Sequence, residues 1–125
     1  MNADARRSLA RLVRASRIAM LGTLRWGTPN VSMVAYIPAR DFATFWLRLS
    51  RLAWHTHDLA ADARVSLAIC EADDGREDPQ TLARLTLRGE AAEIPAADRE
   101  HRGTLLRIEM LEQVRPIPNV AGDKM

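Results

Sequence analysis

The hydrophobic and polar positions along the chain change period once, early in the sequence. Over residues 4–16 the apolar side chains recur at helical spacing, with Leu9, Leu12 and Val13 on one face and arginines on the others. Short apolar runs of strand length follow, separated by segments rich in Gly, Pro and Asp. These runs predict strands at residues 18–24, 31–37, 44–49, 64–70 and 82–91.

Two further segments are predicted to be helical. Residues 52–62 contain neither Gly nor Pro, and their apolar positions share one face with His55. Residues 98–112 also carry apolar side chains at helical spacing, and the tail of residues 113–125 is predicted to be irregular. The order of helix, three strands, helix, two strands and helix is typical of an α+β fold with a small antiparallel sheet or barrel. We expect residues 1–125 to form a single domain.

Composition supports one globular domain with a hydrophobic core. The chain has 125 residues, of which 47% are hydrophobic and 27% charged, and this balance excludes a disordered protein. No apolar run approaches the ~20 residues that a membrane span needs, and the first residues do not resemble a secretory signal. The single cysteine, Cys70, is expected to be a buried thiol in a reducing, cytoplasmic protein.

The basic residues are almost all arginine. The chain contains 17 Arg and one Lys, Lys124, and its pI is 9.3. A nucleic-acid-binding protein would cluster such residues on one face, whereas here acids lie between them everywhere except in the first helix. We therefore expect no nucleic-acid partner, and we expect the arginines of the first helix to form a solvated face.

Familiar catalytic motifs are absent from the sequence. It contains no phosphate loop, no dinucleotide fingerprint and no nucleophile elbow. His55 and His57 are two positions apart and would point to different sides of a helix, so we expect no metal site there. No residue stands out as a general acid or base, and the sequence names no catalytic residue.

One segment has the chemistry of an anion pocket. Between residues 49 and 67 the chain passes from a predicted strand into a predicted helix, with Ser50, Arg51, His55 and Thr56 around the helix start. A helix start offers free N–H groups and the positive end of the helix dipole, and hydroxyls and cations beside it complete a phosphate site. The simpler alternative, which this segment favours when taken by itself, is a helix capped by Ser50 with Arg51 in solvent.

Four segments of the chain together resemble one protein family. They are residues 17–24, 27–34, 49–67 and 83–91. The third contains SRLAWHTHDL, which begins at Ser50 and is similar to the family's Ser-x-Leu-Ala-x-His-Thr-x-Asn-Leu block. On these motifs the chain resembles the FMN-binding split barrels, the pyridoxamine 5'-phosphate oxidase-like proteins, and most closely their haem-utilisation branch. The resemblance covers about residues 8–95, with the motifs in the family's order.

This resemblance implies a six-stranded antiparallel split barrel with flanking helices, which forms a homodimer with two FMN sites at its interface. It also implies a set of cofactor-binding residues. They are Ser32, Met33 and Val34 along the flavin, Leu49, Ser50 and Arg51 at the strand end near the phosphate, His55 and Thr56 as the phosphate-binding pair, and Arg84 beside the flavin or its ribityl chain. The redox chemistry would be that of the flavin.

The sequence departs from the family pattern in three places. His55 stands where the oxidases have a permanent cation, although histidine is usual in the haem-utilisation branch. Asp58 stands where that branch has Asn, and its charge would weaken phosphate binding unless the side chain faces outward. The family has a closing strand after its last helix, and nothing beyond Val114 resembles one. We therefore expect the C-terminal end of the barrel to be shortened or divergent, without the substrate half of an oxidase site.

The sequence thus predicts a cytoplasmic, homodimeric FMN-binding protein, a flavin-dependent oxidoreductase of unknown substrate, with no nucleic-acid or membrane partner. Two alternatives stay open. One is a related split barrel that uses a deazaflavin or haem, because a deazaflavin also carries a phosphate. The other is a degenerate dimeric barrel without a cofactor, which acts as a binding or regulatory module.

Overall fold

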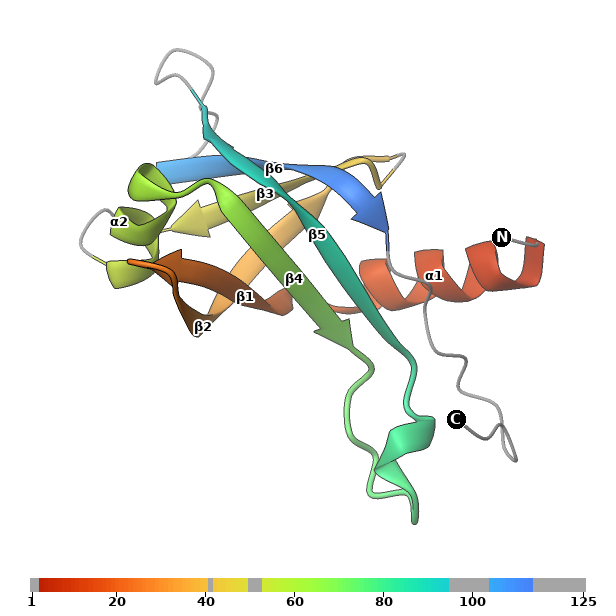
Figure 1. Ribbon diagram of the computed structural model, residues 1–125. Helices are drawn as coiled ribbons and strands as arrows, with labels where there is room; N and C mark the ends of the chain where they lie inside the picture. The colour runs from red at the N-terminus through yellow and green to blue at the C-terminus, as the bar shows by residue number, and fades with distance from the viewer. Residues whose placement is uncertain (1–2, 41, 50–52, 95–103, 114–125) are drawn as a thin grey trace.

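The computed structural model describes residues 3–40, 42–49, 53–94 and 104–113 (Figure 1). Within these residues the chain forms two α-helices, six β-strands and one short 3-10 helix. In chain order they are α1 (Ala3–Ala15), β1 (Ile18–Arg25), β2 (Thr28–Pro38), β3 (Thr44–Leu49), α2 (Trp54–Ala61), β4 (Arg64–Cys70), η1 (Pro79–Thr81), β5 (Arg84–Glu93) and β6 (Thr104–Gln113). In this part of the chain, neither helix is long and apolar enough to cross a membrane.

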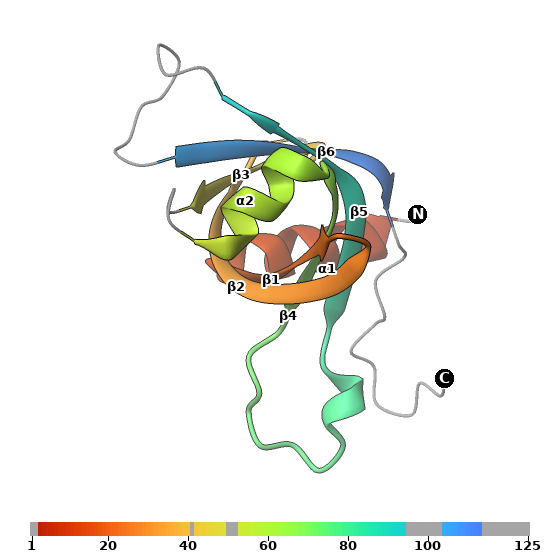
Figure 2. The same cartoon turned by 60° about the vertical axis from the view of Figure 1, so that its left-hand side comes forward.

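The six strands form a closed antiparallel barrel. Their order around it is β1, β2, β3, β6, β5, β4, so β1 pairs with both β2 and β4, and β6 pairs with both β3 and β5. Figure 2 shows α2 in front of the ring of strands and α1 behind it. Both helices contribute to the hydrophobic core, α1 through Leu9, Leu12 and Val13 and α2 through Leu59. The helices thus cover the two ends of the barrel.

The core consists of the inward-facing side chains of the strands. Alternate residues of β1, β3 and β4 are buried, as the pleat of a strand requires. Phe45 of β3 is fully buried, and its ring lies 5.8 Å from the ring of Tyr36 on β2. The Tyr36 hydroxyl donates a 2.7 Å hydrogen bond to the carbonyl oxygen of Val13, near the end of α1. This pair therefore attaches α1 to the barrel.

A two-residue turn joins β1 to β2. Both of its residues have positive φ angles, 51° at Trp26 and 78° at Gly27, as in the type I′ turn of a tight hairpin. Glycine adopts this conformation freely, whereas it is strained for a bulky residue such as tryptophan. The Trp26 side chain is 96% exposed, so packing within this chain does not compensate for that strain.

The C-terminal part of the barrel corrects one prediction. The sequence predicts a helix over residues 98–112, but Thr104–Gln113 forms strand β6, and residues 98–103 lie outside the described residues. The free edges of β3 and β5 each need a hydrogen-bonding partner, and β6 pairs with both. This tertiary requirement outweighs the local helix propensity of a segment rich in Leu, Glu and Arg. The barrel therefore has its closing strand, and that strand lies before Val114.

Cys70 is a second correction. The sequence predicts a buried thiol, but Cys70 is exposed at the end of β4. Val65, Leu67 and Ile69 take the inward positions of this strand, and the alternation leaves Cys70 on the outside.

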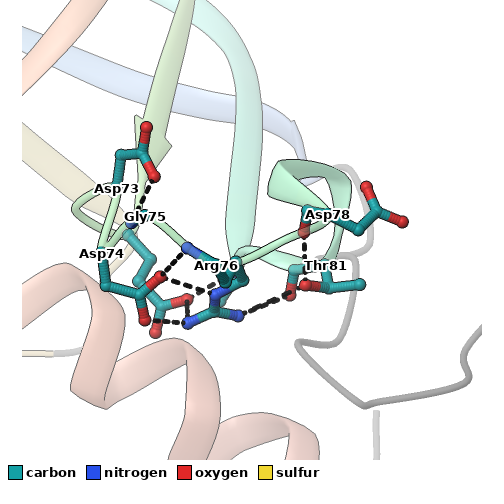
Figure 3. Close-up of polar contacts among 8 residues, drawn as sticks. Asp73, Asp74, Gly75, Arg76, Asp78 and Thr81 are labelled. Carbon is teal, nitrogen blue, oxygen red and sulfur yellow. Dashed lines mark hydrogen bonds and ion pairs between the residues drawn. The ribbon is translucent and has the colours of Figure 1, made fainter.

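The connection between β4 and β5 extends away from the barrel as an ordered arm (Figure 1). Figure 3 shows Arg76 at its centre, where the guanidinium contacts Asp74 at 2.8 Å, Glu71 at 3.1 Å and the Thr81 carbonyl oxygen at 3.3 Å. The hydrogen bonds from Arg76 lower the pKa of Asp74 to about 2. The Asp78 side chain accepts a hydrogen bond from the Gln80 N–H and so caps η1. The predicted polar turn is thus a loop held by its own ion pairs.

Candidate functional site

The start of α2 has no side-chain cap. The helix begins at Trp54, and the residue at the N-cap position is Ala53, which makes no side-chain hydrogen bond to the helix. The first N–H groups of a helix have no partner within it, so an uncapped start leaves donors for an anion. The expected cap, Ser50, does not occupy the N-cap position, and both Ser50 and Arg51 lie outside the described residues.

His55, in the first turn of α2, has a buried ring nitrogen without a partner. Its Nε2 atom makes no hydrogen bond to any described residue, although the side chain as a whole is only half-buried. Burial lowers the pKa of His55, and the nearby charge of Asp58 opposes this only in part. The imidazole is therefore neutral near pH 7 in the chain alone, with an unmet hydrogen-bonding group.

Asp58, one helical turn after His55, faces the barrel. Its side chain is 3% exposed and accepts hydrogen bonds from Thr23 Oγ1 at 3.0 Å and from Arg25 Nε at 2.8 Å and Nη2 at 3.4 Å. The bonds from Arg25 and Thr23 lower the pKa of Asp58 against the opposing effect of burial. An acid at this position would weaken phosphate binding if its charge faced the ligand. The side chain does not face outward, which was the expected exception, but is buried against β1, where the charge of Arg25 compensates its own.

Arg25 also contacts an aromatic pair on the outside of α2. Its guanidinium carbon lies 4.6 Å from the centre of the Trp54 ring, and that ring lies 5.9 Å from the ring of His57. His57 is exposed, whereas His55 Nε2 is buried, so the two histidines point to different sides of the helix. Among the described residues no group of three or more His, Cys, Asp and Glu side chains is arranged to hold a metal ion.

Sequence reasoning missed Thr23 and Arg25. The signal that could have found them is the alternation in β1, where Ala19 and Leu21 point inward and the next inward position is Thr23. A polar side chain on the inward face of a strand needs a partner, and Arg25 follows it on the same face. The partner of both is Asp58, 35 and 33 positions later in the chain, which no local pattern could identify.

The cofactor-binding residues implied on the strands point in different directions. Met33 is 63% exposed and lies beside Met20 of β1, whereas the neighbouring Val34 is buried in the core and Ser32 is partly buried. Leu49, at the end of β3, is also a core residue. Of these side chains, Met33 is the one that is presented to the outside.

Arg84 lies far from the start of α2. It begins β5 and pairs with Cys70, the last residue of β4, whereas α2 leads into the other end of β4 at Arg64. The length of β4 between these ends is about 20 Å at ~3.3 Å per residue. The structure thus gathers His55 and Thr56 at the start of α2, but it does not bring Arg84 to them.

The outward side of the β1–β2 hairpin is apolar. We call this surface the outer hairpin face, and its large side chains are Ile18, Met20, Val31, Met33 and Ile37, all exposed. Gly22 pairs with Val31 on this hairpin. It leaves no room for a side chain, because an added Cβ would come within 2.3 Å of the Ser66 hydroxyl oxygen. Contiguous exposed apolar surface of this kind marks an interaction site.

Comparison with known proteins identifies the fold family. The family model described as pyridoxamine 5'-phosphate oxidase matches residues 6–124. The chain is similar to HutZ, the haem storage protein from Vibrio cholerae, with 17% identity, 85% of this chain and 89% of that chain covered, and a TM-score of 0.73. It is also similar to a protein of unknown function from Agrobacterium tumefaciens, with 26% identity, coverage of 95% and 58%, and a TM-score of 0.75.

A FAD-binding protein from Mesorhizobium loti is a further neighbour, with 18% identity, 86% of this chain and 89% of that chain covered, and a TM-score of 0.69. A search of the curated proteins found no match. The family model covers nearly the whole chain, and the neighbours share its barrel. The chain therefore belongs to the pyridoxamine 5'-phosphate oxidase family and has its split-barrel fold.

Proposed function

We propose that this protein binds FMN, with the flavin phosphate at the start of α2, and acts as a flavin-dependent oxidoreductase. The observation that carries the proposal is the uncapped start of α2 together with the unpartnered, buried Nε2 atom of His55. Backbone N–H groups, an imidazole and the Thr56 hydroxyl are the donors that a phosphate monoester requires. The FAD-binding neighbour supports a flavin ligand for this fold.

The residues present fit a phosphate group once the His55 side chain moves. In the chain alone Nε2 is covered, so the ring must turn about its side-chain torsions to meet an oxygen outside. That movement gives a hydrogen bond to a ring nitrogen that otherwise has none, which favours it. Asp58 makes its hydrogen bonds to Arg25 and Thr23 rather than to the imidazole.

The flavin, when bound, supplies the electron-transfer chemistry. The chain holds the phosphate through His55 and Thr56 and offers an apolar surface to the planar ring through Met33 on the outer hairpin face. Asp58 makes its hydrogen bonds to Arg25 and Thr23, which leaves it unsuited to act as a general acid or base on a substrate.

We also propose that two copies of the chain associate through the outer hairpin face. Five large apolar side chains lie exposed on one hairpin, and burying them against a second copy removes them from water. A flavin ring beside Met33 would then lie at the boundary between the two copies, shielded from solvent on both sides.

Introducing a charge into the outer hairpin face is expected to dissociate the dimer. Met33→Arg places a cation among Met20, Val31 and the same side chains of the partner, where it has no counter-charge. Sedimentation equilibrium is expected to give a dimer for the unaltered protein and a monomer for Met33→Arg. Thr86→Arg, on the exposed side of β5, is the matched control and is expected to remain dimeric. A monomeric unaltered protein would contradict the dimer.

Removing the two side-chain donors at the start of α2 is expected to weaken FMN binding by more than about 100-fold, because each hydrogen bond to a charged group is worth about 1.5–3 kcal/mol. The variant is His55→Ala with Thr56→Val, and flavin fluorescence on titration measures the affinity. Riboflavin, which lacks the phosphate, is expected to bind both proteins equally.

The matched control for this experiment is Thr86→Val, which is expected to bind FMN as the unaltered protein does. Parallel titrations with haem, followed at its Soret band, and with a deazaflavin test the other ligands of this fold. A protein that retains neither FMN nor any of these under saturating conditions would be the cofactor-free binding module, and the proposed function would fail.

A further inference from the structure

The least satisfied polar atom near the proposed site is Nε2 of His55. It is buried and has no hydrogen-bond partner among the described residues. The acid nearest to it along α2 is Asp58, three residues later, and residues at this spacing are neighbours on a helix surface. The carboxylate of Asp58 is the partner that a histidine in this position would ordinarily take.

Asp58 makes its hydrogen bonds to β1 and not to His55, however. Its Oδ1 accepts from Arg25 Nε at 2.8 Å, and its Oδ2 accepts from Thr23 Oγ1 at 3.0 Å and Arg25 Nη2 at 3.4 Å. Arg25 in turn contacts Trp54: its guanidinium carbon lies 4.6 Å from the centre of the Trp54 ring. Three hydrogen bonds from β1, the strand on which α2 packs, thus fix the orientation of the carboxylate.

A protonated imidazole would carry two N–H groups, and the chain alone offers no acceptor for the one at Nε2 among its described residues. The charged groups that α2 and β1 bring to this region are Asp58 and Arg25, whose charges compensate each other. His57 points to the outside of α2 and lies against Trp54. Near neutral pH a proton on His55 thus becomes favourable when an anionic oxygen arrives from a ligand.

We propose that His55 takes up one proton from solvent when a phosphate monoester binds at the start of α2, so that ligand binding and protonation of His55 are coupled. The proton bonds to a ring nitrogen of His55, and the resulting imidazolium donates to a phosphate oxygen. No bond in the ligand breaks. This inference rests on the proposed flavin site and specifies its charge state: the site is neutral at His55 when empty and cationic when it holds a phosphate.

The coupling gives opposite pH trends for the empty and the loaded protein. In the empty protein the pKa of His55 lies below its ordinary value of 6.5, so the unfolded chain binds more protons and stability falls as the pH drops through that region. A bound phosphate raises the same pKa, so the affinity for FMN increases as the pH drops. The limit is about tenfold per pH unit, which corresponds to one proton per ligand.

Isothermal titration calorimetry of the full chain at about pH 7.5 measures the proton directly, because the phosphate of FMN is already a dianion there. Titrations in two buffers of different ionisation enthalpy are expected to show uptake of close to one proton per FMN and none per riboflavin. His55→Gln is expected to bind FMN without proton uptake. His57→Gln removes the neighbouring histidine on the same helix and is expected to behave as the unaltered protein does.

The possible results separate the inference from the function on which it rests. FMN binding without proton uptake, or uptake that persists in His55→Gln, overturns the inference and leaves the flavin site standing. Failure to bind FMN at all overturns the proposed function. If His55→Gln does not fold, NMR titration of the unaltered protein decides the question: the His55 ring resonances must show a raised pKa with FMN but not with riboflavin, and an unchanged pKa overturns the coupling.

Discussion

Arg25→Met is expected to destabilise the protein by about 3 kcal/mol, because it leaves the buried carboxylate of Asp58 without its cation. The Arg25 side chain is 30% exposed and that of Asp58 3%, so the effect is expected near the lower end of the range for a buried pair. Methionine keeps a long apolar side chain beside Trp54, so the loss of stability measures the contribution of the Arg25 charge. Chemical denaturation followed by circular dichroism measures it.

The pH dependence distinguishes a lost charge pair from lost packing. In the unaltered protein the pKa of Asp58 is below its ordinary value of 3.8, so the pair stabilises the fold at neutral pH and stops doing so only as the pH falls through that lowered pKa. Without Arg25, burial raises the pKa of Asp58, and the folded state binds a proton before the unfolded state does. The deficit of Arg25→Met should shrink between pH 7 and 4, and a deficit that stayed constant would contradict the electrostatic explanation.

Arg64→Met is the matched control for this charge pair. Arg64 contacts Asp62 at 2.7 Å just after α2, but its side chain is 70% exposed and solvent screens the interaction. We expect little change in the unfolding midpoint. A loss as large as that of Arg25→Met would mean that burial does not decide the strength of these pairs.

Phe45→Ala is expected to destabilise the protein by about 4 kcal/mol, which is more than the loss of the Arg25 charge. The side chain is fully buried in the hydrophobic core and packs against Tyr36, whose hydroxyl holds the end of α1. Truncation leaves a cavity that the surrounding strands cannot close without losing their register. Thermal unfolding is expected to show a large drop in midpoint, with loss of α1 from the barrel visible as faster hydrogen exchange in residues 9–13.

Two further substitutions on the same strand calibrate this result. Phe45→Leu retains most of the volume and is expected to cost about 1 kcal/mol. Arg48→Ala, on the exposed side of β3, is expected to leave stability almost unchanged. If Phe45→Ala were no worse than Phe45→Leu, the core around Tyr36 would have to be loosely packed.

The sequence predicts most of the elements because their hydrophobic periods are regular. The strand predicted at residues 64–70 is β4 itself, and the helix predicted at 4–16 is α1 with a shift of one residue. The error at residues 98–112 arises because Leu, Ile and Met there fit a helix and a strand equally well. Only the unpaired edges of β3 and β5 decide between them, and these edges exist only in the assembled barrel.

The candidate site is predictable in part for the same reason. The residue types around His55 and Thr56 indicate an anion pocket at a helix start, and the structure does have an uncapped helix start there. The role of Asp58 could not be deduced, because its direction depends on two residues of β1 that are distant in sequence. For Arg84 the local prediction is correct and the site prediction is not supported. The alternation of polar and apolar residues around it predicts strand β5, but this pattern says nothing of the distance between Arg84 and α2.

The position of β6 in the barrel has a consequence for biosynthesis. The strand between β3 and β5 is the last of the six to be translated, so the ring cannot close until residues 104–113 have left the ribosome. Until then the nascent chain carries two open strand edges, which can pair with other chains. Folding of this protein on the ribosome therefore ends with insertion of a strand rather than growth at one edge, and ribosome-bound chains that stop before Thr104 would be the species most in need of chaperones.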